Sequence, residues 1–187
     1  MASTQNLRRR IVMKKMLNIS LPLLLILGSI SLPVEADDTL AKFKGGIGVI
    51  PVSSGMGEGA TAETVNRNIV RGVQPAGQPW VIRNLKANVK TDGKIKVRGE
   101  GLLLGGGNNV GRTAGLSVFA TLICEAAEPF TEHSSEAAGV PLDSNGNFRI
   151  DDELTPAPTS CDSPVLLIRN TATNKAWFAA GIPKSNE

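Results

Sequence analysis

Hydrophobic and polar residues alternate most regularly between Trp80 and Leu104. Apolar or small residues take every second position on both sides of a short turn, at Leu85, Ala87, Val89, Ile95, Val97 and Gly99. A period of two places one set of side chains on a buried face and the other set in solvent. The segment therefore predicts an antiparallel hairpin with one apolar and one polar face.

The length of the turn decides which residues of this hairpin face one another. A two-residue Asp-Gly loop would set Val89 opposite Lys96 and mix core and solvent residues on one face. A three-residue Thr-Asp-Gly loop instead pairs Val89 with Ile95. Its last position, Gly93, takes a left-handed conformation that glycine adopts at least cost. We therefore predict the three-residue loop.

Most of the chain after residue 36 consists of short apolar runs interrupted by Gly and Pro, which number 20 and 11 in the whole sequence. Further expected elements are an edge strand over 43–52 containing Pro51, a covered strand over 116–124, a strand-turn-strand over 139–151, a final hairpin of "PVLLIRN" and "AWFAAGI", and a short helix over 61–70. This pattern predicts a single all-β domain over 37–187. Its expected architecture is an antiparallel β-sandwich, Ig-like or similar, with a β-barrel as the alternative.

Residues 1–36 have the organisation of a secretory signal peptide. Five basic residues precede an apolar stretch over 21–34, and Val34 and Ala36 provide the small residues of a cleavage site. Met13 is an alternative start, and the "MKK" that begins there resembles bacterial leaders. We therefore expect a secreted or periplasmic bacterial protein that begins at Asp37 and has no transmembrane anchor after cleavage.

The leader changes how the charge of the chain is interpreted. The whole chain carries 20 Lys+Arg and 17 Asp+Glu. Cleavage after residue 36 removes five basic residues and one acidic residue, which leaves 15 and 16 and a net charge of −1. The basic character of the full chain thus belongs to the leader, and a nucleic-acid partner is not expected.

The only cysteines are Cys124 and Cys161. In an exported protein such a pair is most simply a disulfide. The sole histidine is His133, so a zinc site is not expected. We predict neither a metal nor a cofactor.

Three segments resemble catalytic or ligand-binding motifs without matching them. The glycine-rich loop over 101–115 lacks the Lys and the following helix of a phosphate-binding loop, so it is expected only to connect two strands. Ser117 lies in a sequence like a nucleophile elbow but is expected inside a strand, and His133 is expected to be solvated in an acidic loop. The segment 143–147 resembles a calcium loop but has its Gly at the wrong position, and fits a β-turn. We therefore assign no catalytic residue.

One feature points to a ligand. The predicted polar face of the hairpin carries Lys86, Lys90, Lys94, Lys96 and Arg98. Like charges that face one another across strands are mildly destabilising, so their presence favours an anionic partner such as an envelope polysaccharide or lipid head groups. The alternative is that these side chains only keep an exposed sheet soluble.

These features predict a non-enzymatic, exported binding or envelope-associated module. A secreted hydrolase with an unrecognised active site is the alternative function. A hydrolase is expected to bring His133, Ser117 and carboxylates into one cleft.

Overall fold

The computed structural model describes residues 38–56 and 64–184. These residues form strands and no helix. The strands are β1 (Thr39–Gly48), β2 (Val52–Met56), β3 (Thr64–Arg67), β4 (Trp80–Val81), β5 (Asn84–Lys90), β6 (Lys94–Glu100), β7 (Leu103–Leu104), β8 (Ser117–Ile123), β9 (His133–Ser134), β10 (Val140–Pro141), β11 (Phe148–Glu153), β12 (Val165–Asn170) and β13 (Trp177–Pro183).

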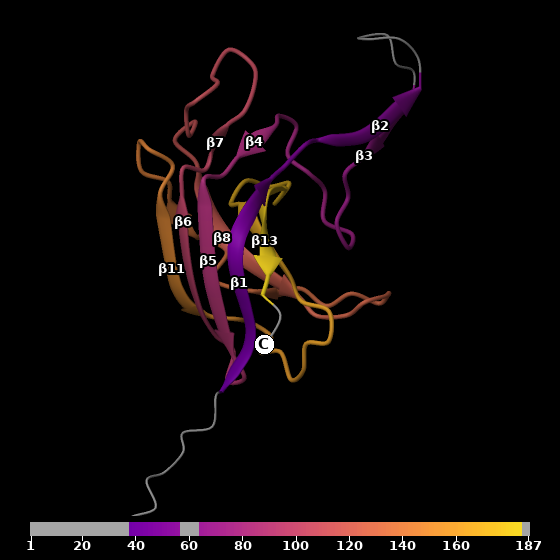
Figure 1. Ribbon diagram of the computed structural model, residues 1–187, viewed down its shortest axis with the longest axis vertical. Helices are drawn as coiled ribbons and strands as arrows, with labels where there is room; N and C mark the ends of the chain where they lie inside the picture. The colour runs from indigo at the N-terminus through magenta and orange to yellow at the C-terminus, as the bar shows by residue number, and fades with distance from the viewer. Residues whose placement is uncertain (1–37, 57–63, 185–187) are drawn as a thin grey trace, which may run out of the picture. The chain divides into compact units, whose positions relative to one another are not determined.

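Nine of the strands belong to one antiparallel sheet. Its order is β10-β8-β12-β13-β1-β5-β6-β11, and β9 pairs with β8. The sheet folds over, so that β1, β5, β6 and β11 lie in front of β8 and β13 in Figure 1. Its two end strands, β10 and β11, come into contact, and the sheet nearly closes. This confirms the all-β antiparallel fold class. The continuous sheet corresponds to the barrel alternative.

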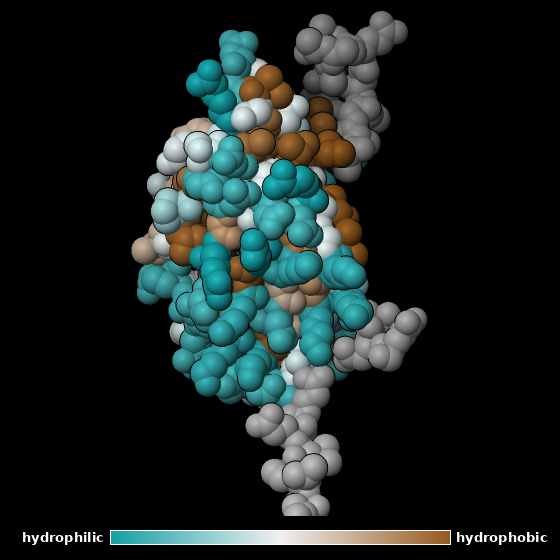
Figure 2. Space-filling view, turned by 60° about the vertical axis from the view of Figure 1, so that its left-hand side comes forward, coloured by the Kyte–Doolittle hydropathy of each residue, from teal (hydrophilic) through white to brown (hydrophobic). Residues whose placement is uncertain are grey.

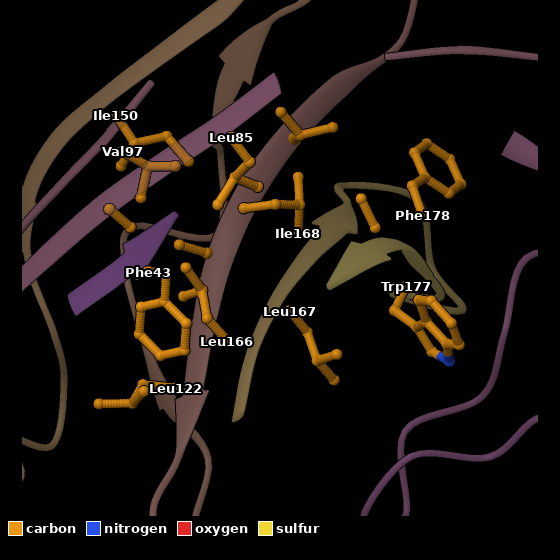
Figure 3. Close-up of a cluster of buried hydrophobic side chains, with 14 of the residues drawn as sticks. Phe43, Leu85, Val97, Leu122, Ile150, Leu166, Leu167, Ile168, Trp177 and Phe178 are labelled. Atoms are coloured by element: carbon orange, nitrogen blue, oxygen red, sulfur yellow. The ribbon is translucent and has the colours of Figure 1, made fainter. Parts of the chain in front are cut away.

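The core lies between the two walls of this folded sheet. Phe43 and Leu85 from one wall and Leu166 and Ile168 from the other belong to a single buried cluster (Figure 3). Their burial follows from the apolar runs, because β8 and β12 are buried along almost their whole length. Sheet faces packed in this way leave the outer face of strands such as β1, β5, β6 and β11 for polar side chains.

The β5–β6 hairpin has the predicted three-residue turn. Val89 pairs with Ile95 and Ala87 pairs with Val97. Gly93 has a φ of 86°, the left-handed conformation expected at the end of this loop. The register derived from the alternation of apolar and polar residues is therefore confirmed.

Three further predicted elements are also present. The covered strand over 116–124 is β8, the segment over 139–151 forms β10, a turn and the start of β11, and the last hairpin consists of β12 and β13.

Two predicted elements are wrong. The expected edge strand over 43–52 is β1, which ends at Gly48 before Pro51 and lies inside the sheet between β5 and β13. The expected helix over 61–70 is instead β3 over Thr64–Arg67, which pairs with β2; residues 61–63 lie outside the described part. A few residues without a buried stripe do not sustain a helix, whereas pairing with a neighbouring strand satisfies the backbone.

The predicted disulfide between Cys124 and Cys161 is present. It joins the end of β8 to the segment before β12. Arg71 strengthens the same junction, because its guanidinium donates hydrogen bonds to the carbonyl oxygen of Ile123 at 2.9 Å and to that of Ser163 at 2.6 Å. The signal peptide predicted over 1–36 lies outside the described residues.

Candidate anion-binding face

The five basic residues predicted as a binding face all lie on the outer side of β5 and β6 or beside their turn. The side chains between them are buried in the core, which leaves the basic side chains on the opposite face. Figure 2 shows the molecule from the side of β11 and β6, where hydrophilic residues cover most of the surface.

Four of the five basic side chains have a carboxylate within 4.0 Å, and three of these four lie towards the turn. Lys90 lies 2.7 Å from Asp38, and Lys94 lies 2.7 Å from Asp92. The hydrogen bond with Lys94 lowers the pKa of Asp92, and the same bond raises the pKa of Lys94. The third, Lys96, is 3.4 Å from an aspartate of β11. The end of the hairpin near its turn is therefore close to neutral.

The neighbouring strands extend the positive charge in a different direction. Lys44 of β1 pairs with Lys86, Lys86 pairs with Arg98, and Arg98 pairs with Arg149 of β11. We call these four residues the basic row. Because adjacent strands lie about 4.8 Å apart, the row covers roughly 14 Å across the sheet.

The basic row is poorly neutralised by its own surroundings. Among the described residues, no acidic group lies within 4.0 Å of Lys44 or Lys86. Arg98 lies 3.4 Å from Glu100, and Arg149 lies 4.0 Å from Asp151. Both arginine side chains are 73% exposed, so these ion pairs contribute only about 0–1 kcal/mol each and leave the guanidinium groups accessible.

The cross-strand positions on either side of the row are less basic. Towards the turn they carry mixed charge: Lys42 pairs with Asn88, Asn88 pairs with Lys96, and Lys96 pairs with Asp151. Away from the turn, Asn84 pairs with Glu100. The positive charge of this face is thus concentrated in one line across the strands.

Two open hollows flank the arginines of the row. The first, of about 360 Å³, is lined on its polar side by Lys86, Asn88, Lys96, Arg98 and Arg149. The second, of about 520 Å³, is lined by Arg83, Arg98, Gly99, Glu100, Asp143, Asn147, Phe148 and Arg149. Arg98 and Arg149 belong to both hollows. They therefore form a cationic ridge between two depressions. The smaller depression has no carboxylate in its lining, whereas the larger one also contains Glu100 and Asp143.

Sequence reasoning located the middle of the row but missed its ends. Lys44 and Arg149 reach it only because β1 and β11 flank the hairpin, and nothing in the local pattern of the hairpin indicates its neighbours. The alternation of polar residues in "KFK" and "FRID" was the available signal.

The glycine-rich loop closes on itself. The backbone N–H of Leu104 donates to the carbonyl oxygen of Arg112 at 2.9 Å, and the N–H of Gly111 donates to that of Leu104 at 2.8 Å. The loop leads into strand β8 as expected, without a helix to face a phosphate.

Ser117 and His133 do not share a cleft. Ser117 begins β8, whereas His133 pairs with Leu122 near the other end of that strand. The expectation that His133 is solvated is wrong, because the residue is only 8% exposed. Its Nδ1 lies 2.7 Å from the carbonyl oxygen of Pro156, to which it donates.

His133 instead lines a small pocket beside the disulfide. The pocket has a volume of about 240 Å³, and its other polar lining residues are Glu125, Thr131, Thr159, Ser160 and Asp162. The backbone N–H of Thr131 donates to Glu125 and lowers the pKa of that carboxyl group. No local sequence pattern indicated this grouping, because the residues come from two separate loops and the short β9.

The segment 143–147 is a turn, as predicted. The carboxylate of Asp143 accepts hydrogen bonds from the backbone N–H groups of Asn145 and Asn147, each at 2.8 Å. The bond from Asn147 is the main cause of the lowered pKa of Asp143. Across the described ranges, no group of three or more His, Cys, Asp or Glu side chains is placed to hold a metal ion.

Comparisons with protein-family models, with curated proteins and with solved structures found no match to this chain. Within the part that the structure describes, no helix has the length and apolar character needed to cross a membrane.

Proposed function

We propose that this protein is an exported bacterial binding module without enzymatic activity, which associates with an anionic component of the cell envelope through its basic row. The observation that carries the proposal is the alignment of Lys44, Lys86, Arg98 and Arg149 across four strands. Repulsion between like charges on adjacent strands is a cost to the isolated fold. A bound polyanion would remove that repulsion, and charge complementarity would also speed association.

The disulfide supports the exported part of the proposal. A bond between Cys124 and Cys161 is compatible with an oxidising compartment outside the cytoplasm. Together with the leader over residues 1–36, it favours a secreted or periplasmic location. Envelope polysaccharides and lipid head groups are the anionic materials present there in quantity.

Charge reversal within the row tests this function. In the variant Lys86→Glu/Arg98→Glu we expect association with isolated envelope material to fall by about tenfold, and wild-type association to weaken as salt rises. The matched control is Arg112→Glu/Lys175→Glu, which makes the same change in net charge at two exposed positions away from the sheet face. Association that is unchanged in the test variant at every salt concentration would show that the row is only a solvated surface.

A secreted hydrolase is the second candidate function. The observation that favours it is the pocket that groups His133 with Ser160, Asp162 and Glu125. Labelling of Ser160 by a serine-directed phosphonate, abolished by His133→Gln, would support an enzyme. Absence of labelling in the folded, oxidised protein would count against it.

A further inference from the structure

We infer, on the basis of this proposed function, that the ligand of the basic row is a linear polyanion that lies across the strands from β1 to β11. The four basic positions follow one another through successive strand pairs, so they form a line perpendicular to the strands. A chain with an anionic group on each repeating unit meets this line at several points along its length.

The surroundings of the row favour a chain over a flat anionic surface. A lipid surface laid on this face would also meet Asp151 and Glu153 of β11 and Asp92 of the hairpin turn, all of which are exposed. Those carboxylates would repel lipid phosphates. A single chain along the row contacts the four basic side chains and leaves Glu153 and Asp92 in solvent, although it passes Asp151 beside Arg149 and Glu100 beside Arg98.

The arginine ridge supplies specific contacts near one end of the line. Arg98 and Arg149 line both hollows, so anionic groups in the two depressions would approach the same pair of guanidinium groups from opposite sides. A guanidinium binds a carboxylate or phosphate through two parallel hydrogen bonds, whereas lysine acts as a point charge. Arg83, on the far side of the larger hollow, would contact the part of the chain beyond the ridge.

This arrangement predicts that affinity depends on ligand length. Each additional anionic group engages the next basic residue as an intramolecular event, which raises the overall affinity until the ligand covers the row. Ligands longer than the roughly 14 Å of the row gain little further affinity, apart from the larger number of equivalent positions in which they can bind.

The test uses two ladders of defined length, oligogalacturonates and linear polyphosphates, and vesicles of phosphatidylglycerol and phosphatidylcholine. We expect the octamer of at least one ladder to bind the mature protein at least about tenfold more tightly than the dimer. The variant Lys44→Glu/Arg149→Glu should lose about tenfold in affinity for the octamer and about twofold for the dimer. The control Arg112→Glu/Lys175→Glu, which makes the same change in net charge at exposed positions away from the sheet face, should change octamer affinity by no more than about twofold.

The outcomes separate this inference from the proposed function. Equal affinity for dimer and octamer, binding to neither ladder, or an unaffected Lys44→Glu/Arg149→Glu variant would overturn the linear polyanion. Vesicle binding that depends on Lys86 and Arg98, without binding to either ladder, would keep the envelope module and assign it a lipid surface. If every variant keeps its association with envelope material, the proposed function is overturned as well.

Discussion

At the scale of single residues, Gly146 and Gly111 have nearly the same backbone but different surroundings. Their φ values are 75° and 78°. A Cβ atom on Gly146 would overlap the backbone of Leu102, whereas a Cβ on Gly111 would have no heavy atom within 4 Å. The pair therefore separates the cost of a left-handed backbone from the cost of close packing.

We expect Gly111→Ala to lower the free energy of unfolding by about 1–2 kcal/mol, the usual cost of a left-handed conformation for a residue with a side chain. Gly146→Ala should cost more than this, because the turn before β11 must also move away from Leu102. Urea unfolding of both variants measures the difference. Equal losses of unfolding free energy in the two variants would show that the turn does not pack closely against the Leu102 backbone.

Asp143 gives a prediction of pH dependence at the same turn. The hydrogen bond from the backbone N–H of Asn147 is the main cause that holds its pKa below the usual value for aspartate. A lowered folded-state pKa means that the contribution to stability is present above the unfolded-state pKa and is lost as pH falls towards the folded-state pKa. Titration followed by carboxyl NMR should place the midpoint of Asp143 below that of aspartate in an unstructured peptide. A midpoint at or above the peptide value would contradict the hydrogen-bonded turn.

At the scale of elements, what could be predicted depended on the distance in sequence between the interacting residues. The β5–β6 register followed from the parity of Val89 and Ile95, because a hairpin is a local structure. The neighbours of that hairpin, β1 and β11, could not be deduced, because pairing with β1 joins residues far apart in the chain. The same limit hid Lys44 and Arg149, and with them the direction in which the positive charge runs.

Burial of polar residues was the other limit. Arg169 is the last residue but one of the apolar strand β12 and is buried, which its sequence position does not indicate. Its guanidinium donates to Glu132 at 2.6 Å and to the carbonyl oxygen of Lys175 at 2.7 Å. These partners lie in loops whose folded positions are set by the whole sheet. The residues that enclose His133 also lie in such loops.

The disulfide is the element-scale feature with the largest expected effect. Replacing Cys124 and Cys161 together by Ala removes the constraint on an unfolded loop of 38 residues, counting both cysteines, a span consistent with their sequence separation of 37. The chain-entropy relation gives about 4 kcal/mol for this loop as an upper figure. Denaturant unfolding of the double variant and of the oxidised wild type measures the loss, and thiol counting should find no free thiol in the exported wild type. A double variant as stable as the oxidised protein would contradict a stabilising role.

At the scale of the whole molecule, the expected mature chain combines a net charge near zero with one strongly basic line. With 15 basic and 16 acidic residues, attraction to a polyanion does not come from net charge. It comes from the sheet order, which places β1, β5, β6 and β11 side by side. Binding should therefore be oriented, with the face shown in Figure 2 towards the ligand.

The most direct test of the basic row is NMR mapping of the mature protein during titration with the anionic fraction of its own envelope. We predict that the largest amide shift changes cluster at Lys44, Lys86, Arg98 and Arg149, and that they diminish with added salt. Shift changes centred instead on the pocket around His133, or spread evenly over the surface, would contradict this prediction.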